Sequence, residues 1–202
     1  MKNASRLNNI KEYYFSKKLR EIEELKSRGI DVINAGIGSP DLVPHKSVIE
    51  ELNKQSNHEN AHKYQSYKGI YELRNAFSVW YKNYFESVLD PNSEILPLIG
   101  SKEGIMHISL AFLGKGDQVL VPDPGYPTYS AAANIAEAEI INYDLKENNG
   151  WLPNLKALEK SNLKKVKIMW INYPHMPTGA SATDNDLLEI IQFGKKNNII
   201  IC

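Results

Sequence analysis

Residues 118–143 read QVLVPDPGYPTYSAAANIAEAEIINY, and this stretch decides the fold class. It opens with an apolar strand pattern, Gln118 to Val121, and closes with another, Ile140 to Tyr143. Between them lie a loop rich in proline and glycine and a helix pattern, Pro127 to Ala138. A strand, a helix and a second strand in this order are typical of a unit that joins two parallel strands.

The same alternation extends to both sides of this stretch. It predicts further strands over residues 31–35, 95–99, 166–171 and 198–202, and helices over residues 5–28, 45–55, 70–84, 101–113, 153–160 and 183–196. Alternating strands and helices predict an α/β fold, in which a mostly parallel sheet is sandwiched by helices. The final apolar run, Ile199 to Cys202, is expected to be a buried strand. Because nothing follows to cover it, we expect the chain to be part of a longer protein.

Composition and charge narrow the class of protein. The chain has 202 residues, of which 42% are hydrophobic, enough for a domain with its own core. Acidic and basic side chains number 24 each, so neither nucleic acid nor a membrane surface is expected as a partner. The single cysteine, Cys202, cannot form an intrachain disulfide, and residues 1–20 lack a signal-peptide pattern. Both observations favour the cytoplasm.

Three segments that follow predicted strands carry the candidate chemistry. In a parallel α/β sheet, ligands bind beyond the carboxyl ends of the strands. A glycine before a helix N-terminus suits a phosphate, and an aromatic side chain on a stiff loop can stack on a planar ring. Each segment alone is better explained as an ordinary turn or helix cap. The segments are residues 100–104 (GSKEG), 124–129 (PGYPTY) and 172–179 (NYPHMPTG).

In combination and order, these segments resemble the class I/II aminotransferases, enzymes of fold type I that depend on pyridoxal 5'-phosphate (PLP). The resemblance covers the chain from about Gly29 onward. The form of residues 101–104 (SKEG) is similar to the LL-diaminopimelate and aspartate aminotransferase branches. Further matching motifs are residues 36–41 (GIGSPD), 63–64 (KY), 69–74 (GIYELR) and 116–119 (GDQV).

The resemblance implies a cofactor site to which four residues of the same subunit, together with Tyr64 of the neighbouring one, contribute. Gly100, Ser101 and Lys102 match the loop whose backbone and hydroxyl hold the PLP phosphate. Tyr126 matches the aromatic ring that stacks on the pyridine ring of PLP. The implied substrates are an amino acid and a 2-oxo acid, between which the enzyme transfers an amino group. No metal site is expected.

The N-terminal segments are implied to serve the substrate and a partner subunit. Gly38 matches a glycine that contacts the substrate. Tyr64 matches a tyrosine that reaches the PLP phosphate of the neighbouring subunit, which implies a homodimer. We therefore expect residues 1–43 to form an N-terminal helix and substrate-contacting segment. Residues 44–202 are expected to form the N-terminal part of the PLP-binding large domain, incomplete at its C-terminal end.

Two departures from the family's pattern bear on catalysis. Met176 stands where the family has an asparagine that donates to the phenolic oxygen of PLP, and a thioether has no N–H to donate. The neighbouring His175 would replace it only if the two side chains pointed the same way. None of the lysines lies in a motif that matches the Schiff-base lysine of the family. No catalytic residue is therefore assigned, and residues 1–202 alone are expected to be inactive.

Other classes of protein remain open at this point. One is a non-catalytic module of the same fold, such as the ligand-sensing domain of a transcription regulator, although residues 1–30 contain no DNA-binding module. Another is a truncated, inactive product. A nucleotide-binding Rossmann protein is a weaker rival, because the glycines at positions 36 and 38 lack the third glycine and the helix of that fingerprint.

Overall fold

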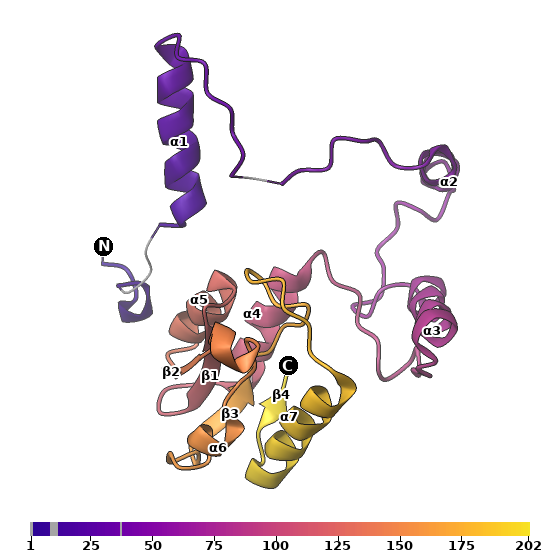
Figure 1. The fold of residues 1–202 in the computed structure, drawn as a ribbon. Coiled ribbons are helices and arrows are strands. Elements are labelled where there is room, and N and C mark those ends of the chain that lie inside the picture. Colours follow the sequence, from indigo (N-terminus) through magenta and orange to yellow (C-terminus); the bar gives the residue numbers. More distant parts are fainter. Residues whose placement is uncertain (1, 9–11, 37) are drawn as a thin grey trace. The chain divides into compact units, whose positions relative to one another are not determined.

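The computed structural model describes residues 2–8, 12–36 and 38–202, and the chain divides into two compact units (Figure 1). One unit consists of Leu98–Cys202 with the described residues before position 12, and the other is Glu12–Pro97. The domain boundary between residues 43 and 44 stays a prediction. Throughout the described ranges, no helix is both long enough and apolar enough to cross a membrane.

Within its described residues, the unit Glu12–Pro97 contains three α-helices, α1 (Tyr14–Ser27), α2 (Lys46–Ser56) and α3 (Tyr71–Phe85). Two of them match the predicted helices at residues 45–55 and 70–84. The helix predicted over residues 5–28 is replaced by a short 3-10 turn, η1 (Ser5–Leu7), and by α1; residues 9–11 lie outside the described residues.

The unit Leu98–Cys202 is built on a four-stranded parallel sheet with the order β2-β1-β3-β4. β1 pairs with β2 along its whole length and with β3 on its other side. This arrangement confirms the predicted α/β class. The strands are β1 (Gln118–Asp123), β2 (Glu139–Asp144), β3 (Val166–Met169) and β4 (Ile200–Ile201). The helical elements are α4 (Ser101–Phe112), α5 (Pro127–Ile135), η2 (Glu147–Asn149), α6 (Leu155–Leu158) and α7 (Asp184–Asn197).

Helices cover both faces of this sheet. Successive side chains of a strand point to opposite faces. Val119 and Val121 of β1 therefore lie in one apolar cluster with residues of α4 and α5. Leu120 lies in a second cluster, with Phe193 of α7 and with α6 side chains packed against it. The unit thus has three layers, with the sheet in the middle.

Local sequence signals explain where two of the helices begin. α5 starts with Pro127, whose missing N–H costs nothing in a first helical turn. α7 starts with a capping box. The Thr183 hydroxyl accepts from the Asp186 N–H at 3.3 Å, and the Asp186 carboxylate accepts from the Thr183 N–H at 2.8 Å. α7 ends at Asn197, and its C-cap residue, Asn198, takes the left-handed conformation with φ 55°.

Two predicted strands are wrong. Residues 31–35 and 95–99 form no strand, because a strand needs the N–H and C=O groups of a neighbour, and the sheet runs only from β2 to β4 among the described residues. Their side chains stay largely accessible: Ile33 is 91% and Ile99 is 99% exposed.

The last strand also departs from expectation. Ile199 is buried as predicted, but Ile200 is 39% exposed, so the run is not buried along its whole length. The reason is that, in the part of the chain that the structure describes, β4 pairs with β3 alone and forms one edge of the sheet.

Candidate functional site

The strand order brings the loops after β1 and β3 next to each other. β1 lies between β2 and β3. After β1 the chain adds β2 on one side of it, and then crosses over to add β3 on the other side. Such a switch point creates a crevice at the carboxyl ends of the strands. The Trp170 N–H, directly after β3, donates to the Leu120 carbonyl of β1 at 3.0 Å. β1 and β3 are therefore still hydrogen-bonded to each other close to the point where their loops begin.

The N-terminus of α4 contains the predicted phosphate loop. Gly100 precedes the helix, and Ser101 and Lys102 lie in its first turn. The N–H groups of a first turn have no acceptor within the helix and carry its positive dipole end. A side chain at Gly100 would meet no atom within 4 Å, so the backbone is open to approach. The acidic side chain of this turn, Glu103, is already engaged, since it accepts from the Ile99 N–H at 2.7 Å.

The structure brings this helix start together with the loop after β1. The Nζ atom of Lys102 lies 5.8 Å from the ring centroid of Tyr126, within the range of a cation–π contact. Lys102 is exposed and Tyr126 is half-buried. A cation, a helix N-terminus and an aromatic ring therefore occur at one place. This set of groups suits a ligand that carries both an anionic group and a planar ring.

The ring of Tyr126 is supported from the core by two further aromatic side chains. Tyr129 meets it edge to face, with ring centroids 5.8 Å apart and an interplanar angle of 80°. Tyr129 in turn stacks on Trp170, with centroids 5.0 Å apart and an angle of 10°. Both supporting side chains are buried, at 7% and 4% exposure. The position of Tyr126 is thus fixed by the core of the unit.

The turn after β3 holds the third predicted segment. His175 is 2% exposed and its Nδ1 atom lies 2.8 Å from the Thr178 hydroxyl. Met176 is 44% exposed, and its N–H donates to the Asn172 side chain at 3.0 Å. The two adjacent side chains therefore differ sharply in environment. His175 is committed to the interior of the turn and does not take the place of the asparagine that Met176 replaces.

The other two predicted residues belong to the unit Glu12–Pro97. Gly38 and Tyr64 are both exposed there, and Tyr64 is fully accessible. Their assignments to substrate and to a partner's phosphate stay predictions.

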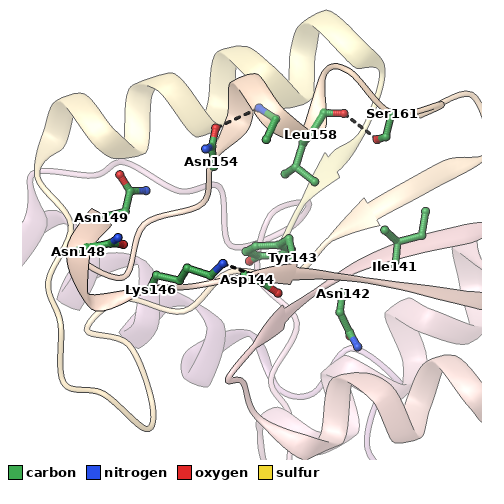
Figure 2. A pocket seen from close by; sticks show the side chains of 11 residues that line it. Ile141, Asn142, Tyr143, Asp144, Lys146, Asn148, Asn149, Asn154, Leu158 and Ser161 are labelled. Atoms are coloured by element: carbon green, nitrogen blue, oxygen red, sulfur yellow. Dashed lines mark hydrogen bonds and ion pairs between the residues drawn. The ribbon is translucent and has the colours of Figure 1, made fainter.

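A pocket of about 700 Å³ opens elsewhere, along the edge strand β2 (Figure 2). Several of its polar side chains are engaged with one another or with nearby backbone. Lys146 and Asp144 form an ion pair at 3.1 Å, and the Asn154 side chain accepts from the Ala157 N–H at 3.0 Å. None of the residues predicted for the cofactor lines this pocket. The pocket is therefore separate from the group around Lys102 and Tyr126.

Comparison with known proteins decides the family. The family model described as "Aminotransferase class I and II" matches residues 30–202. The chain belongs to this family. Aminotransferases of class I and II are generally PLP-dependent and act on amino acids and 2-oxo acids. The resemblance found in the sequence is thus confirmed.

Two relatives of this aminotransferase chain have the same name. The chain is 42% identical over 202 residues to an LL-diaminopimelate aminotransferase of Dehalococcoides mccartyi, covering 100% of this chain and 52% of the relative. It is 42% identical over 198 residues to a protein of the same name from Aquifex aeolicus, covering 98% of this chain and 51% of the relative. The chain therefore spans about half the length of the curated relatives it matches.

Solved structures agree on the fold. The apo BacF structure from Bacillus subtilis matches with a TM-score of 0.94 at 31% identity, covering 100% of this chain and 51% of that one. The aspartate aminotransferase of Thermotoga maritima matches with a TM-score of 0.88 at 25% identity, covering 98% of this chain and 52% of that one. The similarity therefore extends over both units of the aminotransferase chain.

Sequence reasoning missed the residues that support the site. Tyr129 lies three residues after Tyr126, a spacing that places both on one side of a helix start. That spacing was the available signal. Trp170 offered none, because its contact with Tyr129 joins the end of β3 to α5 across the sequence. The aminotransferase motifs likewise contained no signal that His175 is buried.

One hydrogen bond beneath this site makes a direct prediction about stability. The Tyr143 hydroxyl of β2 donates to the Trp170 carbonyl at 2.6 Å, and burial raises the pKa of Tyr143. Replacing Tyr143 with phenylalanine leaves that buried carbonyl without its donor, which costs about 1–3 kcal/mol. Urea unfolding should show this loss, whereas Tyr67→Phe, a change at a fully exposed ring, should stay within about 0.5 kcal/mol. Equal stability of the two variants would contradict the prediction.

Proposed function

We propose that the intact gene product is a PLP-dependent aminotransferase that moves an amino group between an amino acid and a 2-oxo acid. The observation that carries the proposal is the contact between Lys102, in the first turn of α4, and the Tyr126 ring after β1. The names of the relatives make LL-diaminopimelate the first amino acid to test and aspartate the second.

The donor groups fit PLP, which has a phosphate and a flat aromatic ring. The Ser101 hydroxyl, the Lys102 ammonium group and the N–H groups at the start of α4 suit a phosphate dianion. The open side of Gly100 gives such a group access to the backbone. The half-buried face of Tyr126 suits the pyridine ring. When bound, PLP supplies the electron sink that amino-group transfer needs.

The chain's own contribution is binding and orientation. Tyr126, supported by Tyr129 and Trp170, sets the plane in which an aromatic ligand lies. Lys102 and the dipole of α4 hold the anionic end of the ligand. Met176 has no N–H in its side chain, so the turn after β3 gives no hydrogen bond from this position. The proposed site therefore relies on stacking and phosphate binding more than on this turn.

Five further assignments belong to the proposal. Gly38 contacts the substrate, and Tyr64 reaches the phosphate of a partner subunit in a homodimer. Residues 1–43 form the substrate-contacting segment, and residues 44–202 form part of the PLP-binding large domain. The enzyme acts in the cytoplasm.

The proposal is tested with the intact gene product, incubated with PLP and freed of excess cofactor. We expect a visible absorbance band from bound PLP, and loss of that band on addition of LL-diaminopimelate. Pyridoxal, which lacks the phosphate, is the matched control ligand. We expect it to bind about tenfold or more weakly, because it forfeits the charge-assisted hydrogen bonds at α4.

The outcomes separate the rival functions. Binding of PLP with no amino-group transfer to any 2-oxo acid would favour a ligand-sensing module. No absorbance band at any PLP concentration would overturn the proposal. Equal affinity for PLP and pyridoxal would leave an aminotransferase in place but would reject Ser101 and Lys102 as the phosphate site.

A further inference from the structure

β2 forms one edge of the sheet, and half of its backbone groups point away from β1. Its register with β1 is continuous over its whole length. The N–H groups of Glu139 and Leu145 both donate to backbone carbonyls beside the two ends of β1, at 2.9 and 2.8 Å. Because the backbone groups of a strand alternate in direction, those of Ile140, Asn142 and Asp144 point outward. Within the described ranges, no strand pairs with them.

This edge lacks most of the features that block an edge strand. Natural edges are often blocked by a proline, a lysine, a bulge or a very short strand. β2 has six residues, EIINYD, with neither proline nor lysine, and it pairs with β1 without a register shift. Its charged side chains are the acidic ones at its two ends. The backbone of β2 is therefore open to an added strand.

The pocket of about 700 Å³ lies along this same edge (Figure 2). Four consecutive residues of β2, 141–144, line it. Successive side chains of a strand point to opposite faces, and Figure 2 shows the side chains of Ile141 and Asn142 leaving β2 in opposite directions. The pocket is therefore open to the backbone edge of β2 and not only to one face of the strand.

The part of the pocket that is made by η2 and the cap of α6 offers hydrogen bonds to a neutral group. The Asn149 side chain donates to the Leu152 carbonyl at 2.9 Å, which leaves its oxygen as an acceptor. The Asn154 oxygen accepts from the Ala157 N–H at 3.0 Å, which leaves its amide nitrogen as a donor. A side chain that both donates and accepts, such as that of threonine or glutamine, fits these groups.

The surface around this edge is acidic. Residues 137–147 carry four carboxylates and one ammonium group, an excess of three negative charges. A second copy of the chain would bring the same excess to the edge, and the repulsion opposes such pairing. The occupant that fits by charge is a basic segment of a different protein. The charged side chains, all exposed, are those of Glu137, Glu139, Asp144, Lys146 and Glu147.

We infer that β2 binds an extended, basic segment of a partner protein, which adds to the sheet as a further strand and places a neutral polar side chain in the pocket. In strand addition, main-chain hydrogen bonds supply affinity, and pockets for alternate side chains supply specificity. Here the outward groups of Ile140, Asn142 and Asp144 supply the hydrogen bonds. None of the residues proposed to hold PLP takes part, so the inference does not depend on the proposed function.

The test ligand is a short synthetic peptide, blocked at both ends, in which valine and threonine alternate between two terminal lysines. It is added to the intact gene product, and amide hydrogen exchange is followed residue by residue. We expect exchange at Ile140, Asn142 and Asp144 to slow by about tenfold or more near saturation, because their N–H groups gain acceptors. If these three amides exchange equally fast with and without the peptide, the inference is overturned.

Two control peptides separate the contributions of backbone and charge. A peptide that is N-methylated at alternate residues has lost donors on its pairing side, and it should bind about tenfold or more weakly. A peptide with glutamates in place of the lysines should bind about fivefold or more weakly, and this difference should shrink at high salt. Equal affinity of the methylated peptide would reject strand addition. Equal affinity of the glutamate peptide would reject a basic partner.

A substitution in β2 tests the edge from the side of the protein. Asn142→Pro removes an outward N–H and leaves the bonds to β1, which is the arrangement in which an edge strand accepts proline. We expect peptide affinity to fall about tenfold or more in Asn142→Pro and to stay within about threefold in Asn142→Thr, which keeps the N–H. Urea unfolding shows whether both variants fold.

The remaining outcomes also decide the inference. A folded Asn142→Pro variant that binds the peptide like the parent would show that the edge is not the site. If this variant does not fold, the exchange pattern and the methylated peptide still decide. Self-association of the parent that slows exchange at the same three amides without any peptide would overturn the inference in favour of a second copy.

Discussion

Replacing Gly125 with alanine is expected to lower the free energy of unfolding by about 1–3 kcal/mol, the cost of forcing an atom into packed space. A Cβ at this position would overlap the Pro122 carbonyl oxygen and lie 2.8 Å from the Pro122 Cγ. Pro122 belongs to β1, the strand that pairs on both sides, so its backbone cannot shift without disturbing the sheet. The loop must move instead, and Tyr126 moves with it. Urea unfolding measures the first effect and PLP titration the second.

Gly114→Ala is the matched control for this substitution. A Cβ there would meet only the Asp117 carboxylate, at 3.9 Å, which is ordinary contact. Its stability should stay within about 0.5 kcal/mol of the parent. If both alanine variants are equally stable, then Gly125 is not required by its close approach to Pro122. If Gly125→Ala is destabilised but binds PLP normally, the loop does not position the cofactor.

Removal of the Tyr126 ring is expected to raise the dissociation constant of PLP by about tenfold to a hundredfold. Stacking of a heteroaromatic ring on an aromatic side chain contributes about 1–3 kcal/mol. Tyr126→Ala removes that contact and also the ring beside which the Lys102 ammonium group lies. PLP affinity is measured by equilibrium titration of the apoprotein.

Tyr126→Phe is the informative control, because it keeps the ring and loses only the hydroxyl. Its dissociation constant should stay within about threefold of the parent value. Unfolding of both variants should also be compared, since the ring contacts Tyr129. A phenylalanine variant as weak as the alanine variant would assign the binding to the hydroxyl and not to stacking.

The sequence patterns located most of the elements of the α/β unit. β1, α4 and α7 were found because their apolar spacing and their end signals are local. The strand predicted at residues 95–99 failed for the opposite reason: an apolar run becomes a strand only beside a partner, and Ile99 remains 99% exposed. The helix predicted at residues 153–160 is shorter in the structure, where α6 begins only at Leu155 because the Asn154 side chain caps it, accepting from the Ala157 N–H at 3.0 Å.

The sequence predicted the candidate site about as completely as it predicted the elements of the fold. The resemblance named Lys102 and Tyr126, and the structure places them side by side. It did not name Tyr129, Trp170 or the orientation of His175. Those features arise from contacts between α5, β3 and the turn after β3, which depend on tertiary packing. Sequence motifs thus point to the groups that meet a ligand, and packing determines what holds those groups in place.

The strand order β2-β1-β3-β4 also has a consequence for folding. β1 and β2 are joined by residues 124–138, which contain α5, whereas the segment between β1 and β3, residues 124–165, is nearly three times as long. Closing the longer loop adds an entropic cost of about 0.9 kcal/mol. The crevice beside Tyr126 comes into existence only when this second closure is complete. A ligand held by both loops therefore recognises only the finished sheet. It stabilises the last step of assembly in proportion to the logarithm of its concentration, once that concentration is well above its dissociation constant.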